Sequence, residues 1–170
     1  MARTRGIHWA HTTHGTWLHG DWRGSWKDGR LIGPDPFLEN RMRRRMHHTR
    51  VALTEAEQQI VAEAFGQVIA ERHHRVLAAT IQSTHIHLVF APLGEPIEEV
   101  ITRFNRRSAA AVFAARRDAG IDCPRHLWTA GRFPRFIFDD QHLRNAIEYV
   151  RKHNTRTGRP RDPYEWIARL

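Results

Sequence analysis

Hydrophobic and polar positions divide the first third of the chain into a strand, a loop and a basic stretch. Residues 7–18 are rich in Trp, Thr and Ile, which is typical of a β-strand. Residues 19–36 carry several Gly, Pro and Trp residues and predict a long irregular loop. Residues 37–53 are strongly basic and fit either a short surface helix or an ordered arm.

Two long segments have apolar residues at helical spacing. Thr54 lies three residues before Glu57, which is the spacing of a capping box, and the apolar residues that follow predict a helix over 55–73. Residues 97–118 repeat the same period and predict a second helix that is rich in arginine.

Strand-like runs occupy 76–82 and 85–92, and only two polar residues separate them, which favours an antiparallel hairpin. A fourth strand region covers 127–140. Helical spacing over 142–154 predicts a third helix.

The resulting order is strand, helix, strand, strand, helix, strand, helix. It predicts an α+β fold, the ferredoxin-like or RRM-like split β-α-β arrangement, with a four-stranded antiparallel sheet and an added C-terminal helix that carries Tyr149. The two long helices would share one face of the sheet and leave the other face free for a substrate. The 170 residues suit a single domain, with a basic Gly- and Trp-rich insertion at about 19–50 and a basic tail at 155–170.

The charge balance favours an acidic polymer as partner. The chain has 27 Lys and Arg against 18 Asp and Glu, a net charge of +9 with neutral histidines, and such a basic protein attracts nucleic acid. Charge that only aids solubility is the alternative. Cys123 is the single cysteine, which excludes an intramolecular disulfide, and no apolar stretch approaches the roughly 20 residues of a membrane span. We therefore expect a cytoplasmic protein without a membrane partner.

Two histidines occupy alternate positions of the strand predicted at 85–92. Because alternate residues of a strand point to the same side, His85 and His87 project from one face while Ile86 and Leu88 project from the other. Two imidazoles one pleat apart can bind one metal ion. In a chain with 13 histidines, such a pair also occurs without a role.

On the helix predicted at 142–154, Tyr149 and His153 are four residues apart. Residues at this spacing lie on one helix face, so the phenol and the imidazole would emerge side by side. Taken alone, the tyrosine is better explained as a half-buried core aromatic, and the histidine as a partner of the helix C-terminal dipole.

Together these features resemble the HUH endonucleases, and more narrowly the single-tyrosine transposases of insertion sequences and the REP-associated tyrosine transposases. Four stretches carry the resemblance: HGTWLHGDWRGSW at 14–26, HIHLVF at 85–90, LWTAGRFPRFIFDDQHLRNAIEYVRKHN at 127–154 and HNTRTGRPRDPYEW at 153–166. The last stretch is similar to the family's Asn-Pro-Val-Arg-x-Gly tail, which a Tyr and a Trp follow, and it matches at Arg156, Gly158, Tyr164 and Trp166.

The resemblance implies metal-dependent cleavage and rejoining of single-stranded DNA, often beside a hairpin. Tyr149 would attack the scissile phosphate and form a 5′-phosphotyrosine link. His85, His87 and His153 would hold a divalent cation, Mg²⁺ or Mn²⁺. Such relatives act either as dimers that exchange tyrosine helices or as monomers, so a homodimer is one of two alternatives.

Two departures from the family pattern concern the metal. The position four residues after the tyrosine is usually Asn or Gln, and here it is His153. An imidazole favours softer ions than an amide oxygen does, so Mn²⁺ would serve better than Mg²⁺. The Asn-Pro pair is replaced by His153 and Asn154, which leaves Asn154 as a rival ligand if the helix ends early.

Charge and stacking on aromatic rings would hold a single DNA strand. The candidate phosphate contacts are arginines of the basic stretch, the second helix and the tail: Arg41, Arg43, Arg44, Arg45, Arg103, Arg106, Arg107, Arg156, Arg159 and Arg161. A merely solvated arginine face is the alternative on the second helix. Trp22 and Trp26 lie in the Gly-rich loop, where they would either stack on bases or anchor the loop.

Three functions compete. The first is a tyrosine transposase or a domesticated relative. A non-catalytic, RRM-like nucleic-acid-binding protein would need exposed aromatics on its sheet, where this sequence has histidines. A replication initiator or relaxase usually has a longer chain or a second domain. The remaining histidines receive no role, including His8, His11 and His14, which are spaced by three.

Overall fold

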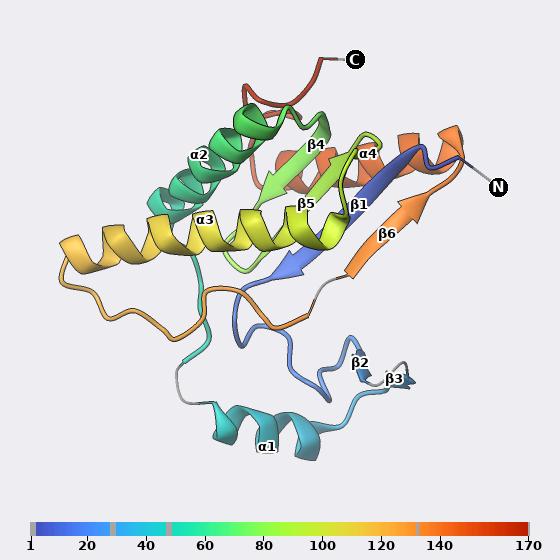
Figure 1. Cartoon of the computed structure of the whole chain (residues 1–170). Coiled ribbons are helices and arrows are strands. Elements are labelled where there is room, and N and C mark those ends of the chain that lie inside the picture. Colours follow the sequence, from blue (N-terminus) through green and yellow to red (C-terminus); the bar gives the residue numbers. More distant parts are fainter. Residues whose placement is uncertain (1–2, 28–29, 47–48, 132, 170) are drawn as a thin grey trace.

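A four-stranded antiparallel sheet forms the centre of the molecule in the computed structural model, which describes residues 3–27, 30–46, 49–131 and 133–169 (Figure 1). In spatial order the strands are β4 (Val76–Ile81), β5 (His85–Phe90), β1 (Gly6–Thr12) and β6 (Phe133–Ile137). β4 and β5 pair as the predicted antiparallel hairpin. β1 pairs with β5 on one side and with β6 on the other, so it is a central strand.

Two long helices, α2 (Glu55–Arg72) and α3 (Ile97–Asp118), cover one face of this sheet, and α4 (Asp140–Arg156) lies on the other face (Figure 1). The chain order β1-α2-β4-β5-α3-β6 confirms the predicted ferredoxin-like α+β fold. Helix α4 is the predicted addition after the last strand of the sheet.

Local capping and aromatic packing explain how the helices dock on the sheet. Thr54 and Glu57 make both hydrogen bonds of the predicted capping box, which fixes the start of α2. Phe65 of α2, Phe90 of β5 and Phe104 of α3 are fully buried, and the Phe104 ring contacts the other two edge-on. The main core therefore lies between the sheet and these two helices.

The sequence predicted that the sheet face opposite α2 and α3 is open. In the structure, part of this face is covered. Helix α4 packs against β4 and β5, where Ile147 and Val150 join Leu77, Ala78 and Val89 in a second apolar cluster. An amphipathic helix must bury its apolar side, and these two strands offer it an apolar surface. The prediction of a free face is therefore wrong for β4 and β5.

Strand β1 is shorter than the strand predicted over 7–18, because it ends at Thr12. The hydroxyl of the next residue, Thr13, donates to the carbonyl of Val51 over 2.6 Å. Gly15 then has a left-handed backbone conformation, with a φ of 76°. The chain leaves the sheet here through contacts with residues far along the sequence.

The predicted loop and the basic stretch contain a small hairpin and a helix. Strands β2 (Ser25–Lys27) and β3 (Arg30–Ile32) pair with each other, and α1 (Pro36–Arg45) follows. The side chain of Asp35 caps α1 by accepting the backbone N–H of Leu38, and proline suits the first helical position. Of the two alternatives for the basic stretch, the surface helix is confirmed, and none of its ten residues is buried.

The tail packs on the body of the fold. The rings of Tyr164 and Trp166 stack with centroids 4.8 Å apart, and the indole N–H of Trp166 donates to the carbonyl of Ala62 in α2. Ile167 forms a parallel bridge with Val76 of β4. Within the described part of the chain, no helix combines the length and apolar character of a membrane span.

Candidate active site

Strand β5 presents two histidines on the face that α4 covers. Ile86 and Leu88 are fully buried in the core with α2 and α3, so the alternate residues His85 and His87 face the other side. Both imidazoles are partly buried. The alternation expected from the sequence is therefore present.

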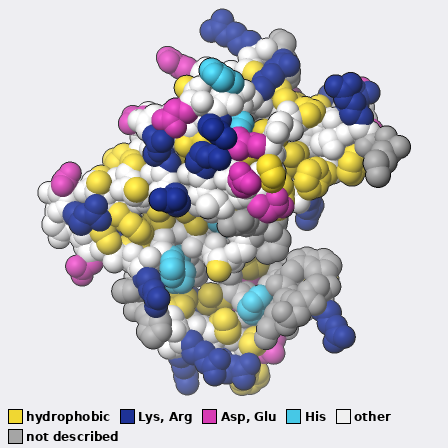
Figure 2. Space-filling model, viewed as in Figure 1, with side chains coloured by type: hydrophobic (Ala, Val, Ile, Leu, Met, Phe, Trp, Pro, Cys, Tyr) yellow, Lys and Arg dark blue, Asp and Glu magenta, His cyan; other side chains and the backbone are white. Residues whose placement is uncertain are grey.

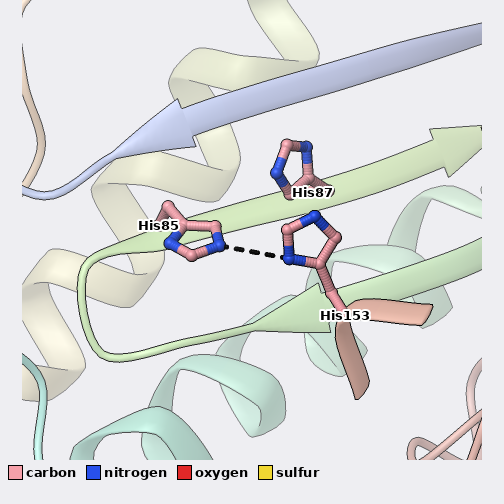
Figure 3. A group of neighbouring side chains, drawn as sticks. All are labelled: His85, His87 and His153. Atoms are coloured by element: carbon pink, nitrogen blue, oxygen red, sulfur yellow. Dashed lines mark hydrogen bonds between the residues drawn. The ribbon is translucent and has the colours of Figure 1, made fainter. Parts of the chain in front are cut away.

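Helix α4 brings a tyrosine and a third histidine to the same place. The rings of Tyr149 and His153 have centroids 4.8 Å apart, and the Tyr149 ring also meets that of His87 edge-on at 5.5 Å. Nε2 of His85 lies 3.5 Å from Nδ1 of His153. His85, His87 and His153, here called the three-histidine cluster, each have one ring nitrogen that could bind a metal ion, and these three nitrogens all lie within 4.8 Å of one another (Figure 3).

Both ends of α4 are fixed, which sets the positions of Tyr149 and His153. The side chain of Asp139 caps the start by accepting a backbone N–H of the first turn. Near the end, the buried amide of Asn154 donates to the carbonyls of Ala79 over 2.9 Å and Arg161 over 3.0 Å. Asn154 is thus held against β4, and His153 is the residue that α4 contributes to the three-histidine cluster.

Burial favours the neutral form of all three imidazoles. It lowers the pKa of His87 to about 2, and the neighbouring histidines act in the same direction. Burial is also the largest cause that lowers the pKa of His85 and of His153. Because an imidazole binds metal only when neutral, the cluster has the protonation state of a ligand set at neutral pH.

The donor set fits a divalent cation. Nε2 of His153 is buried and has no hydrogen-bond partner among the described residues. Buried polar atoms are normally satisfied, so a nitrogen in this state is suited to an ion as its partner. Three imidazoles suit borderline transition metals better than they suit Mg²⁺.

A fourth histidine, His8 of β1, lies beside the cluster, although the sequence assigned it no role. Its Nε2 is 3.1 Å from Nδ1 of His87, and its ring centroid is 6.1 Å from that of Tyr149. Burial lowers its pKa to about 4, with the charges of Arg135 and His153 acting in the same direction. The position of His8 beside the cluster depends on how β1 is aligned with β5. The spacing of residues within β1 does not contain this alignment, so the sequence could not predict it.

A comparison with protein families decides what kind of protein carries this site. The family model described as "Transposase IS200 like" matches residues 43–153, more than half of the chain, including the three-histidine cluster and Tyr149. The chain belongs to the IS200-like transposase family. No curated protein sequence matches it.

A solved structure shares the fold of this IS200-like transposase family member, and a second was also matched. A REP-associated tyrosine transposase bound to a REP hairpin aligns with a TM-score of 0.53 at 11% identity, over 93% of this chain and 72% of that one. A candidate transposase from Deinococcus radiodurans R1 aligns with a TM-score of 0.49 at 12% identity, over 90% of this chain and 92% of that one. At 11% identity the first likeness supports the fold alone, and the family rests on the sequence match.

The arginines predicted to contact DNA in this IS200-like protein fall into two groups. Five are engaged within the fold: Arg43 with Glu39, Arg103 with Glu95, Arg107 with Glu71, Arg159 with Gln58 and the carbonyl of Ile81, and Arg161 with Glu148. Five others make no ion pair with another described residue: Arg41, Arg44, Arg45, Arg106 and Arg156. Figure 2 shows a group of basic side chains over α1, at the foot of the molecule.

Aromatic side chains are also exposed in the segment between β1 and α2, which contains α1. Trp22, one of the two tryptophans predicted to stack on bases, is 78% exposed. Trp26 lies opposite Leu31 in the β2–β3 pair, and its side chain is outside the described residues. Phe37 of α1, to which the sequence assigned no role, is also exposed.

Proposed function

We propose that this chain is a metal-dependent transposase that cuts and rejoins single-stranded DNA through a 5′-phosphotyrosine link at Tyr149. The observation that carries this proposal is the contact of the Tyr149 ring with the rings of His87 and His153, two of the imidazoles that can share a cation. The phenol of Tyr149 and a cation held by these histidines could therefore act on the same phosphate, the first as nucleophile and the second by neutralising the phosphate charge. Membership of the IS200-like family supports DNA strand transfer as the class of reaction.

Tyr149 supplies the nucleophile. Its side chain is 49% exposed, so a DNA strand can reach it while its ring rests on the neighbouring imidazoles. The phenolic oxygen forms a bond to phosphorus as the bond from phosphorus to the 3′ oxygen breaks. The phenol loses one proton and the departing 3′ oxygen gains one, so the step is balanced. Rejoining reverses it with a 3′-hydroxyl from another strand, which conserves the bond energy without a nucleotide cofactor.

The three-histidine cluster would hold a divalent cation, which when bound neutralises a phosphate oxygen and orients it for in-line attack. The sheet fixes His85 and His87, and the anchored end of α4 fixes His153, so the ligand nitrogens are already close together. Their neutral state leaves lone pairs for the ion. Because imidazole suits softer ions than an amide oxygen does, we propose that Mn²⁺ binds more tightly than Mg²⁺.

The substrate we propose is a single DNA strand beside a hairpin. One protein with the same fold is a REP-associated tyrosine transposase bound to a REP hairpin. The segment between β1 and α2 offers the exposed arginines of α1 and the exposed ring of Trp22. Phosphate neutralisation and base stacking are the two interactions that hold single strands without sequence preference.

Covalent trapping tests the nucleophile. The protein is incubated with Mn²⁺ and a pool of hairpin oligonucleotides with single-stranded flanks, labelled at the 3′ end, and is then run on a denaturing gel. Because Tyr149 would stay attached to the 5′ phosphate of the downstream fragment, the label should migrate with the protein. Tyr149→Phe should abolish this adduct. The matched control Tyr164→Phe, which removes the hydroxyl of the chain's other tyrosine, should retain it.

An adduct that survives Tyr149→Phe, or that forms equally well in EDTA, overturns the proposed mechanism. Wild-type protein that binds the oligonucleotides but forms no adduct with any of them would instead support a non-catalytic nucleic-acid-binding relative.

A further inference from the structure

His8 lies on the central strand β1, next to the strand that carries two members of the three-histidine cluster. In the sheet it is opposite Val89 of β5 on one side and Arg135 of β6 on the other. Val89 packs against α4, so His8 shares the face of His87. The His8 ring is partly buried and contacts the rings of His87 and Tyr149, with centroid distances of 5.2 and 6.1 Å. The proposed mechanism makes no use of this imidazole.

A hydrogen bond joins His8 to His87 across 3.1 Å, between Nε2 of His8 and Nδ1 of His87. A neutral imidazole has one N–H donor and one acceptor nitrogen, so only one of the two rings donates. If His8 donates, Nε2 of His87 must carry the proton and cannot bind an ion. If His87 donates, its Nε2 keeps a lone pair.

The second arrangement is the one that a metal site needs. Because His8 engages Nδ1 of His87, Nε2 is the nitrogen of His87 that is left to act with His85 and His153. Metal-binding histidines usually donate their other ring N–H to a neighbouring acceptor, which fixes both the tautomer and the orientation of the ring. His8 is in the place of such an acceptor.

We infer that His8 is a positioning residue, whose Nε2 accepts the Nδ1–H of His87 and so keeps Nε2 of His87 unprotonated and available to the shared cation. This inference rests on the proposed function of the three-histidine cluster. An imidazole acceptor adds no negative charge, unlike the carboxylate that often has this task. The full charge of the cation therefore remains available to the phosphate of the DNA.

Imidazole ¹⁵N NMR on the metal-free protein at slightly alkaline pH tests the tautomer directly. We expect His87 to carry its proton on Nδ1 and His8 to carry its proton on Nδ1 as well, with Nε2 of His8 accepting the hydrogen bond. A proton on Nε2 of His87 would overturn the inference. This measurement uses the wild-type protein and therefore does not depend on the folding of any variant.

Mn²⁺ binding followed by electron paramagnetic resonance tests the consequence for the metal site. His8→Phe keeps the volume of a ring but removes the acceptor, and we expect it to weaken Mn²⁺ binding about 10- to 100-fold. His8→Gln restores an acceptor near the position of Nε2 and should recover most of the loss. His142→Phe, which changes an exposed histidine at the other end of α4, should bind as the wild type does.

The same experiment separates a failure of this inference from a failure of the proposed function. If His85→Ala leaves Mn²⁺ binding unchanged, the metal centre itself is wrong. If His85→Ala abolishes binding while folded His8→Phe binds as tightly as the wild type, only the role of His8 is wrong. Nitrogen hyperfine coupling that identified His8 as a fourth ligand would also overturn its role as an acceptor.

Discussion

Acid should destabilise the metal-free protein strongly, because the imidazoles around Tyr149 are buried in their neutral form. Burial lowers the pKa of His8 to about 4 and that of His87 to about 2, from an ordinary value of 6.5. Below pH 6.5 the unfolded chain therefore binds protons that the folded chain does not. The contribution of these rings to stability is complete above pH 6.5 and is lost as the pH falls toward the folded pKa values.

The size of the effect follows from these pKa values. At about pH 5, each ring lowers the free energy of unfolding by about 2 kcal/mol, because each pH unit below the ordinary pKa contributes about 1.4 kcal/mol. His8 and His87 together contribute about 4 kcal/mol. The pKa values of His85 and His153 are also lowered by burial and act in the same direction. Typical domains have only about 5–15 kcal/mol in total, so this loss is large.

Urea unfolding in EDTA, measured at about pH 7.5 and about pH 5, gives the loss directly. The wild type should lose at least about 4 kcal/mol between the two conditions, and His8→Phe should lose about 2 kcal/mol less than the wild type because one titrating ring is gone. His142→Phe leaves the buried rings in place and should lose as much as the wild type. The pKa values of Glu57 and Glu95 lie below the ordinary 4.5, so their carboxylates remain mostly ionised in both conditions.

Two results would refute this reasoning. One is a wild-type stability that does not change between the two conditions. The other is an equal loss for the wild type and for His8→Phe, which would mean that His8 takes up its proton in the folded protein as readily as in the unfolded chain.

Three further changes probe the packing and the metal. Gly66→Ala should lower the melting temperature despite the better helix propensity of alanine, because the new Cβ would lie 2.8 Å from Cδ1 of Trp166. We expect the free energy of unfolding to fall by about 1–3 kcal/mol. A higher melting temperature would contradict this prediction. Arg116→Gln should lower the free energy of urea unfolding by about 1–3 kcal/mol near neutral pH, because it leaves the mostly buried Glu57 carboxylate without its ion pair. That difference should shrink in acid as the carboxylate becomes protonated, and a constant difference would count against the ion pair. His153→Gln replaces an imidazole with an amide oxygen, so the ratio of Mn²⁺ affinity to Mg²⁺ affinity in titrations should fall about tenfold. An unchanged affinity ratio would mean that residue 153 is not a metal ligand.

Local signals made most of the fold predictable from the sequence. The helix predicted over 97–118 coincides with α3, and the capping box at Thr54 fixes the start of α2 as expected. Alternation in β5 was enough to place His85 and His87 on one face, because a strand's period of two does not depend on its neighbours. In the same way, helical spacing was enough to place Tyr149 beside His153.

The features that the sequence missed depend on partners far along the chain. Strand β1 ends just before Thr13, whose hydroxyl donates to the carbonyl of the distant Val51. The role of His8 depends on how β1 is aligned with β5, which no pattern within either strand contains. The β2–β3 pair is a different case, because the Gly-rich composition of residues 19–36 favoured an irregular loop over paired strands.

The anchoring of α4 by Asn154 makes the whole site depend on one axial setting of this helix. A slip by one turn would move its side chains by about 5.4 Å along the axis. That displacement exceeds the 4.8 Å within which the nitrogens of the three-histidine cluster lie, and it would carry Tyr149 and His153 away from β5 together. An identical helix supplied by a second molecule would rebuild the site in full only if its own Asn154 engaged Ala79 in the same register.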